Sequence, residues 1–217
     1  AIRERVISML ANVSDELAQG VADGIGIAVP AAMPPVLARP ATPEVTASPA
    51  LSLMARPGEG GVKTRHVALL VADGIDARSL RTVHAALAAA GAVPRFVGAR
   101  LGRVQPRAGE PIHVEVTMET APSVLWDGVV IPAGDTGLAA VGAAVDFVKD
   151  QYRHCKTILA LGAESALLER AMVPTARQDG SDDPGLLMTA HADSAGRFIA
   201  ALSCHRHYGR ETDPPVV

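Results

Sequence analysis

The segment Thr157–Leu168 has the pattern of a buried strand, a tight turn at Gly162 and the start of a helix. In many hydrolytic α/β enzymes a sharp turn of this kind holds the nucleophile, because the strained backbone exposes one side chain above the sheet. The positions that could hold it here are Leu161, Gly162, Ala163 and Glu164, and none carries a thiol or hydroxyl. The sequence therefore predicts the geometry of a nucleophile turn without its reactive atom.

Two further side chains near this turn could take part in chemistry. Ser165 lies one residue beyond it, where its hydroxyl is expected to hydrogen bond to local backbone. The spacing from Gly162 to Ala166 does not match the Gly-x-Ser-x-Gly pattern of a serine nucleophile. Asp76 follows the first predicted strand, and we expect it to cap the helix that begins near Ser79 or to pair with a neighbouring arginine. A retained pocket acid is the alternative role for Asp76.

Two loops that contain glycine follow predicted strands. In the turn Gly134–Gly137, Asp135 or Thr136 is expected to cap the following helix, while Gly134 permits the change of direction. The loop Ala72–Ala77 contains acids and lacks the Ser, Thr and Gly residues that offer backbone N–H groups to a phosphate. We therefore expect no flavin and no other cofactor in this chain.

His205 and His207, with Cys204 beside them, are the strongest candidates for metal ligands. The last predicted helix covers about Asp193–His205, and helical residues two positions apart point about 200° away from each other. Such a pair does not share one ion. Histidines near the end of a helix, beside its terminal carbonyls, are the expected arrangement, so we predict no metal site.

The elements that must position these residues alternate between strand and helix. Apolar runs predict strands at His66–Ala72, Val93–Val97, between Val104 and Thr120, Gly128–Ile131 and Thr157–Leu161. Apolar residues at helical spacing predict helices at Ser79–Ala90, Leu138–Tyr152 and Asp193–His205. This alternation predicts an α/β fold, a three-layer α/β/α sandwich with a mostly parallel sheet.

The chain before this region is organised differently. Residues 2–27 carry apolar side chains at helical spacing, with Ser14 as a helix start and Gly26 as a stop. Seven prolines then fall between positions 30 and 57, which favours an extended linker. We therefore divide the chain into two short helices at 1–29, a Pro-rich linker at 30–63 and an α/β domain at 64–217.

Composition limits the class of partner. The 217 residues carry a net charge of −3 with interspersed signs, so a nucleic-acid partner is not expected. No apolar run reaches the roughly 20 residues that span a bilayer, so no membrane partner is expected. Cys155 and Cys204 are the only cysteines, which favours a reducing cytoplasm. The chain begins at Ala1 rather than Met, as expected of a fragment of a longer chain.

Several segments resemble the large-subunit haem catalases. Ile2–Val6, Asn12–Ala18 and Val21–Ile27 are similar to the end of the helical domain of these catalases. Their appended C-terminal domain resembles three segments of this chain: Val67–Ile75, Pro122–Gly134 and Phe198–Tyr208. The resemblance implies a flavodoxin-like fold related to the class I glutamine amidotransferases. It also implies a role in stability, in access to the buried haem and in chaperone-like protection, within a tetramer.

The resemblance places the catalytic groups of the parent upstream of this chain. The only tyrosines, Tyr152 and Tyr208, lie outside the Arg-rich context of the family's haem ligand, so haem is expected in the parent and not here. Asp76 stands where relatives carry an acid that contacts the nucleophile, and it becomes a vestigial acid. The expected partners are the rest of the catalase chain, its other subunits and unfolding client proteins.

Two other functions stay open at this point. One is a hydrolase, deglycase or amidotransferase-like enzyme of the same superfamily, using Ser165, Glu164 or a distant cysteine. The other is an autonomous module that dimerises through a sheet edge or through the helices at 2–27. The absence of a nucleophile at the turn favours the non-catalytic domain of a catalase over the enzyme, whereas light scattering would test the dimerising module.

Overall fold

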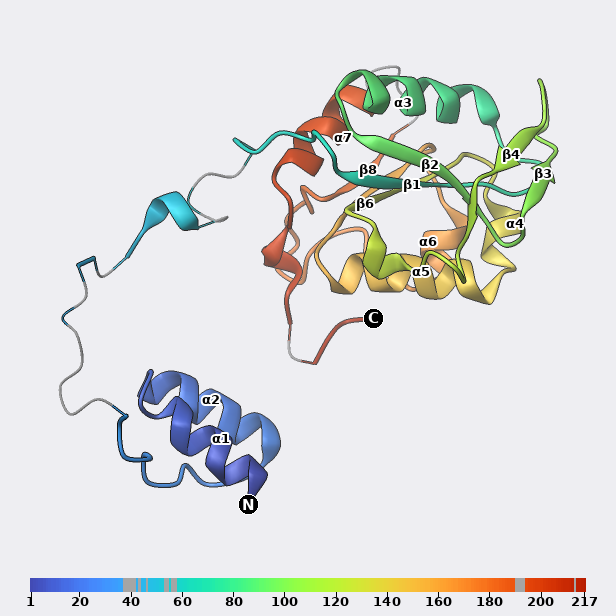
Figure 1. Cartoon of the computed structure of the whole chain (residues 1–217). Coiled ribbons are helices and arrows are strands. Elements are labelled where there is room, and N and C mark those ends of the chain that lie inside the picture. Colours follow the sequence, from blue (N-terminus) through green and yellow to red (C-terminus); the bar gives the residue numbers. More distant parts are fainter. Residues whose placement is uncertain are drawn as a thin grey trace. The chain divides into compact units, whose positions relative to one another are not determined.

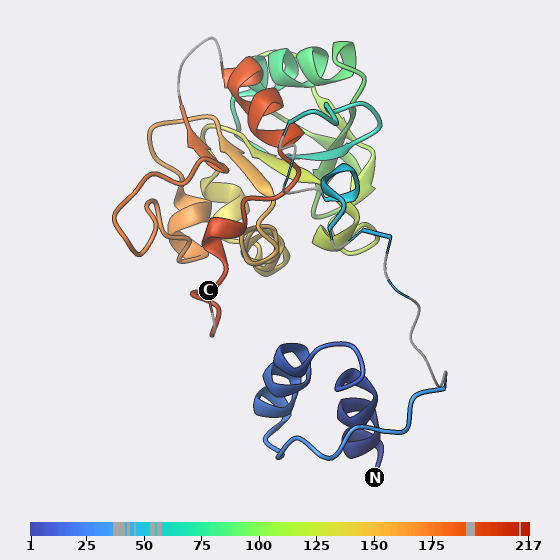
Figure 2. The same cartoon turned by 90° about the vertical axis from the view of Figure 1, so that its left-hand side faces the viewer.

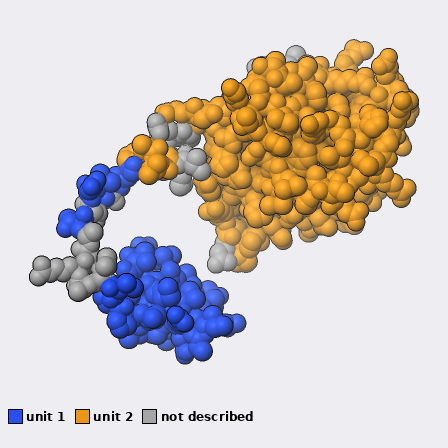
Figure 3. Space-filling view, in the orientation of Figure 1, with its two compact units in different colours: residues 1–48 blue, residues 49–217 orange. Residues whose placement is uncertain are grey.

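The computed structural model describes residues 1–36, 42, 44–45, 47–52, 55, 58–189, 194–212 and 214–217. The chain forms two compact units, Ala1–Ser48 and Pro49–Val217, shown in different colours in Figure 3. Each unit has a buried core of its own. Parts of the expected linker, among them Pro40, Pro43 and Pro57, lie outside the described residues, as does Asp193 at the expected start of the last helix.

The first unit is a pair of helices, α1 (Ile2–Leu10) and α2 (Asp15–Ile25). The Ser14 hydroxyl accepts a hydrogen bond from the Leu17 N–H at 3.3 Å, so it caps α2 as predicted. Gly26 ends α2 in the left-handed conformation, with φ of 69°. The core of the pair is small, because its fully buried apolar side chains are those of Ile7, Ala18 and Ala22.

The beginning of the expected linker runs along α1. The Met33 N–H donates to the Ser8 carbonyl at 3.0 Å, and the Ser8 hydroxyl donates to the Ala31 carbonyl at 2.5 Å. The Asn12 side-chain amide donates to the Met33 carbonyl at 2.7 Å. These bonds satisfy backbone groups that proline-rich chain cannot pair with itself. Residues 31–33 are therefore bound to the first helix.

The second unit is built on a six-stranded sheet (Figure 1) with the order β5-β2-β1-β6-β7-β8. Its strands are β1 (His66–Leu70), β2 (Val93–Gly98), β5 (Val116–Thr117), β6 (Gly128–Ile131), β7 (Thr157–Ala160) and β8 (Leu186–Met188). Every neighbouring pair is parallel. A separate antiparallel hairpin pairs β3 (Gly102–Val104) with β4 (Ile112–Val114). The sequence did not predict β8, because three apolar residues are too short a run to distinguish a strand from a loop.

Helices cover both faces of this sheet, as Figures 1 and 2 show. On one face lie α3 (Ala77–Ala89) and α7 (Ser194–Ser203); on the other lie α4 (Thr136–Ala139), α5 (Gly142–Arg153) and α6 (Ala166–Arg170). Successive residues of β1 alternate between the two cores: Leu69 packs with α3 and α7, and Leu70 packs with α5 and α6. The predicted three-layer sandwich is confirmed.

Two helix predictions need correction. The expected helix Leu138–Tyr152 is two helices, α4 and α5. Val141 between them adopts an extended conformation, which β-branched residues favour, and this interrupts the helix. The last helix ends at Ser203, two residues earlier than expected, and His205 beyond it has a φ of 67°. Of the described helices, none has the length and apolar character needed to cross a membrane.

Candidate functional site

The predicted site lies at the carboxyl edge of the sheet, where the loops after parallel strands meet. The loops after β1 and β6 are joined by a hydrogen bond from the Asp76 N–H to the Ala133 carbonyl, at 2.9 Å. The loops after β6 and β7 are joined through Asp135 and Ser165, whose side chains are 2.5 Å apart. The structure therefore brings the predicted residues to one edge, but in two separate groups.

The turn after β7 differs from the predicted nucleophile turn. None of the residues Leu161–Ser165 adopts a positive φ, whereas a nucleophile turn holds a strained conformation. Leu161 is buried, and its N–H continues the sheet by donating to the Ile131 carbonyl at 2.9 Å. Gly162 avoids a clash, since a Cβ there would lie 3.0 Å from the Glu164 carbonyl oxygen. The turn thus lacks both the reactive atom and the strain.

Ser165 and Asp135 together cap helix α6. The Ser165 hydroxyl accepts from the Leu168 N–H at 3.1 Å, which is the expected local bond to backbone. The Asp135 carboxylate accepts from the Ser165 hydroxyl and from the N–H groups of Ala166 and Leu167, at 2.5 to 3.2 Å. Asp135 is the N-cap residue of α4, one of the two positions expected, but its carboxylate makes no capping hydrogen bond to that helix. The carboxylate instead satisfies orphan N–H groups of a helix 30 residues away.

Asp76 caps helix α3. Its carboxylate accepts from the Arg78 N–H at 3.0 Å and from the Ser79 hydroxyl at 2.9 Å, so the helix-cap expectation describes its contacts. A hollow of about 550 Å³ lies beside it, lined by Asp76, Arg78, Arg81 and Gly109 among others. This hollow is separate from the one beside Ser165, which has other lining residues. The acid and the turn after β7 therefore do not share a pocket.

Arg107 occupies the space over the turn after β6. Gly134 has a φ of 77°, and a Cβ on it would lie 3.1 Å from a guanidinium nitrogen of Arg107. The Arg107 backbone N–H donates to the Ile75 carbonyl at 3.0 Å, which fixes the approach of the chain. The glycine turn after β6 is thus covered by an arginine side chain that the sequence did not single out.

The opposite, amino edge of the sheet holds a buried ion pair that sequence reasoning missed. The side chains of Asp183 and Arg210 are each 1% exposed, and the Arg210 Nε donates to the carboxylate at 2.5 Å. Arg210 also donates to the Lys156 carbonyl at 2.6 Å and lies 4.8 Å from the centre of the Tyr152 ring. The two partners are 27 residues apart in the sequence, so no local sequence pattern indicates that they pair.

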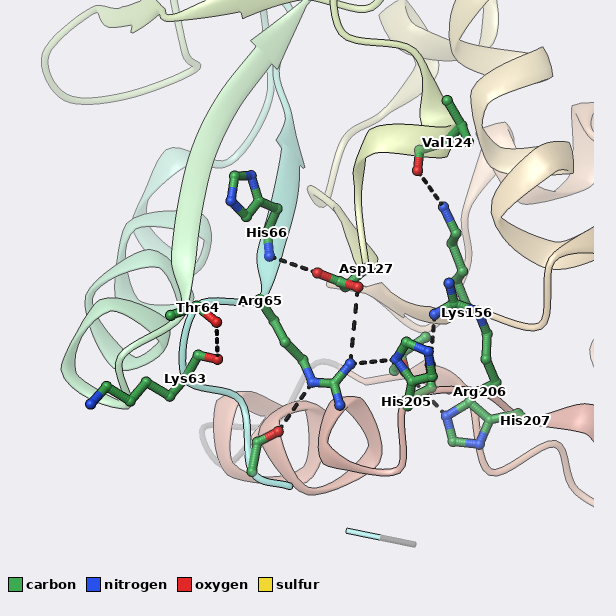
Figure 4. A network of polar contacts seen from close by, with 12 residues as sticks. Lys63, Thr64, Arg65, His66, Val124, Asp127, Lys156, His205, Arg206 and His207 are labelled. Atoms are coloured by element: carbon green, nitrogen blue, oxygen red, sulfur yellow. Dashed lines mark hydrogen bonds and ion pairs between the residues drawn. The ribbon is translucent and has the colours of Figure 1, made fainter. Parts of the chain in front are cut away.

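His205 and His207 lie in the loop after α7 and not on a helix, so the helical argument against a shared metal does not apply to them. His207 is buried, contacts the Thr157 hydroxyl at 3.1 Å, and has its pKa lowered to about 4, chiefly by burial and then by Arg210. Burial also lowers the pKa of His205, followed by the charges of Arg206 and Arg65. Figure 4 shows His205 directed toward Arg65, whose guanidinium is 2.5 Å from its Nδ1. Within the described ranges, no three His, Cys, Asp or Glu side chains gather as metal ligands.

The fold defines the class of protein. A two-domain protein from Anabaena variabilis with DJ-1/ThiJ/PfpI-like and ferritin-like domains superposes with a TM-score of 0.56, at 17% identity over 64% of this chain and 47% of its own. A ThiJ/PfpI family protein from Pseudomonas syringae superposes with a TM-score of 0.55, at 20% identity over 66% of this chain and 74% of its own. The second unit therefore has the flavodoxin-like α/β fold of this class.

The chain belongs to the family described as the C-terminal domain found in long catalases, which matches residues 63–212. It is 33% identical to Catalase HPII of Pseudomonas putida over 100% of this chain, and 33% identical to Catalase C of Rhizobium meliloti over 97% of it. In each case the alignment spans 29% of the relative, so the chain corresponds to less than a third of the length of these catalases. The predicted family is confirmed.

Proposed function

We propose that this chain is a non-catalytic C-terminal part of a haem catalase, and that it acts by stabilising the parent enzyme, assembling its tetramer and framing the entrance for hydrogen peroxide. The observation that carries this proposal is the alignment of the whole chain with under a third of a catalase, in the family of its C-terminal domain. The proposal also includes a cytoplasmic location. It keeps the division of the chain into the end of the helical domain at 1–29, a Pro-rich linker at 30–63 and the C-terminal α/β domain at 64–217.

The state of the carboxyl edge supports a non-catalytic role. The turn Leu161–Glu164 offers no thiol or hydroxyl, and a serine nucleophile needs a base that can take its proton. Ser165 instead donates to Asp135, a carboxylate that already accepts two backbone N–H groups. Asp76 is also engaged, as the cap of α3. These contacts favour a vestigial site over the enzyme alternative.

Haem does not fit this chain itself. Catalases hold haem iron through a tyrosine, and the ligating oxygen must reach the iron of a bound haem. Tyr152 is buried with its ring against Arg210, and Tyr208 lies at the surface beside Glu211 and Arg153. We therefore assign the haem and the chemistry on peroxide to the preceding part of the parent.

The exposed apolar side chains of the first unit support a role in contact. Ile2 is 81% exposed and Val13 is 74% exposed, and the side chains of Val6, Met9 and Leu17 are also open to solvent. Two short helices with three fully buried apolar residues gain little stability alone, so this surface is suited to packing against another part of the parent or an unfolding client. Client binding predicts that the 217-residue chain suppresses aggregation of a heat-stressed test enzyme at a stoichiometric ratio. If the test enzyme aggregates as fast with the chain as without it, the chain does not bind unfolding clients.

The test of the main proposal uses the full-length parent and two truncations. One ends after Ser48 and removes the second unit; the other ends after Val29 and removes the Pro-rich segment as well. We expect peroxide turnover per haem at 25 °C to be retained in the first truncation and heat inactivation to be faster, because buried interface area is lost. A truncated enzyme that resists heat as well as the parent would contradict a stabilising role. Turnover by the isolated 217-residue chain would contradict its non-catalytic assignment.

A further inference from the structure

A cluster of cations lies at the amino edge of the sheet, on the opposite side from the carboxyl-edge loops. Lys156 is only 3% exposed and precedes β7, and Arg206 follows α7. Both line a hollow of about 300 Å³, together with Arg153, Tyr208 and Glu211. Figure 4 shows Lys156 and Arg206 close together, with Lys156 reaching toward the Val124 carbonyl.

The buried ammonium of Lys156 is incompletely satisfied by the protein. It donates to the Ser123 carbonyl at 2.9 Å and to the Val124 carbonyl at 3.3 Å, but an ammonium has three donors. Among the described acids, none comes within 4.0 Å of it. A buried charge without an ion-pair partner is costly, so this arrangement is suited to an added negative charge.

Neighbouring groups increase the local excess of positive charge. Burial and then the charge of Arg206 lower the pKa of Lys156 to about 8, against the weaker opposing effects of Asp127 and Asp150. Asp127 is already engaged, since it accepts the His66 N–H at 2.9 Å and lies 3.9 Å from Arg65. At neutral pH the residues that line the hollow therefore include three cations, Lys156, Arg206 and Arg153, and one acid, Glu211; the Nε of Arg153 also donates to the Val217 carbonyl.

We propose that this hollow, formed by Lys156, Arg206 and Arg153, is a binding site for a phosphate group, either the free ion or a phosphate monoester. Arg206 is half-buried, its described hydrogen bond is to the His205 carbonyl at 2.9 Å, and a guanidinium has five donors, which leaves others for an oxyanion. A tetrahedral dianion presents enough oxygens to contact an ammonium and a guanidinium at once. The small volume admits such a group but not the stacked bases of a nucleic acid strand.

The test is a titration of the ¹⁵N-labelled 217-residue chain with inorganic phosphate at pH 7.0, with chloride keeping the ionic strength constant. We expect saturable shifts of the amide signals of residues 153–156 and 206–211. Phenyl phosphate, titrated in the same way, reports whether a monoester enters. Arg206→Gln and Lys156→Met are expected to weaken binding by at least about tenfold, because each removes a charge-assisted contact. Arg103→Gln, the same change on the exposed hairpin strand β3, is the matched control and is expected to bind as the unchanged chain does.

Three results would overturn the proposal. The first is the lack of a saturable response to phosphate in the unchanged chain. The second is undiminished binding in Arg206→Gln, which is half-buried and serves as the informative variant if Lys156→Met does not fold. The third is an equal response to acetate at the same ionic strength, since a monoanionic carboxylate does not supply the charge and oxygens of a phosphate.

Discussion

Replacement of Asp183 by alanine tests the most deeply buried ion pair among the described residues, Asp183 with Arg210. The substitution leaves the guanidinium of Arg210 buried, with one hydrogen bond to the Lys156 carbonyl and the ring of Tyr152 beside it. One nitrogen of this guanidinium, Nη2, has no hydrogen-bond partner even in the unchanged chain. Removing one partner of a buried ion pair costs about 3–5 kcal/mol, because the other charge stays in a poorly solvated site.

The assay is urea unfolding at pH 7 followed by the fluorescence of Trp126. This side chain is buried in the second unit, where its indole N–H donates to the Ala121 carbonyl at 2.9 Å. For an m-value of about 2 kcal/mol per M, the expected loss moves the midpoint down by about 1.5–2.5 M. Asp182→Ala is the matched control, since Asp182 is an exposed neighbour and a surface substitution changes stability by about 0.5 kcal/mol or less.

A double variant distinguishes the loss of an ion pair from general damage. Arg210→Met in the background of Asp183→Ala removes the second charge and fills its volume with an apolar side chain. We expect the double variant to be more stable than Asp183→Ala alone, since no uncompensated charge then remains. A shift below about 0.5 M for Asp183→Ala, or a double variant less stable than the single one, would refute the reasoning.

Three other predictions concern a glycine, a histidine and the two cysteines of the second unit. Gly185→Ala is expected to cost about 2–3 kcal/mol, because its Cβ would lie 2.2 Å from the ring of His207, whereas Gly142→Ala meets nothing within 4 Å and is expected to be neutral or slightly stabilising; urea midpoints measure both. The lowered pKa of His207, about 4 against an ordinary 6.5, means that the unfolded chain binds a proton that the folded chain does not. Stability should therefore fall by about 2 kcal/mol from pH 7 to pH 5, and the fall should be smaller in His207→Gln. Burial raises the pKa of the Cys155 thiol, so a thiol reagent at pH 7.5 should modify the half-buried Cys204 first.

Each of these three has an outcome that contradicts it. Equal midpoints for the two glycine variants would mean that the space beside His207 is open. An unchanged pH profile in His207→Gln would assign the acid loss of stability to carboxylates. Rapid modification of Cys155 in the folded chain would show an activated thiol and would restore the enzyme alternative.

Sequence alone determined the layers of the second unit and its family. Continuous apolar runs such as Gly128–Ile131 are buried on both faces in a parallel sheet, and that pattern is local, so it is readable before the chain folds. The caps at Ser14 and Asp76 were readable for the same reason, since each bonds to backbone within three residues. The absence of a thiol or hydroxyl from Leu161–Glu164 is also a property of the sequence itself.

Only the tertiary structure decided which side chains from distant segments contact those elements. The carboxylate of Asp135 caps a helix 30 residues away, and Asp183 pairs with Arg210 across 27 residues, so neither contact has a signal in local spacing. The backbone at Leu161–Ser165 lacks positive φ, a property set by how the turn packs and not by residue types alone. The physical reason is range: capping and periodicity act over a few residues, whereas burial of charge depends on which distant segments the sheet brings together.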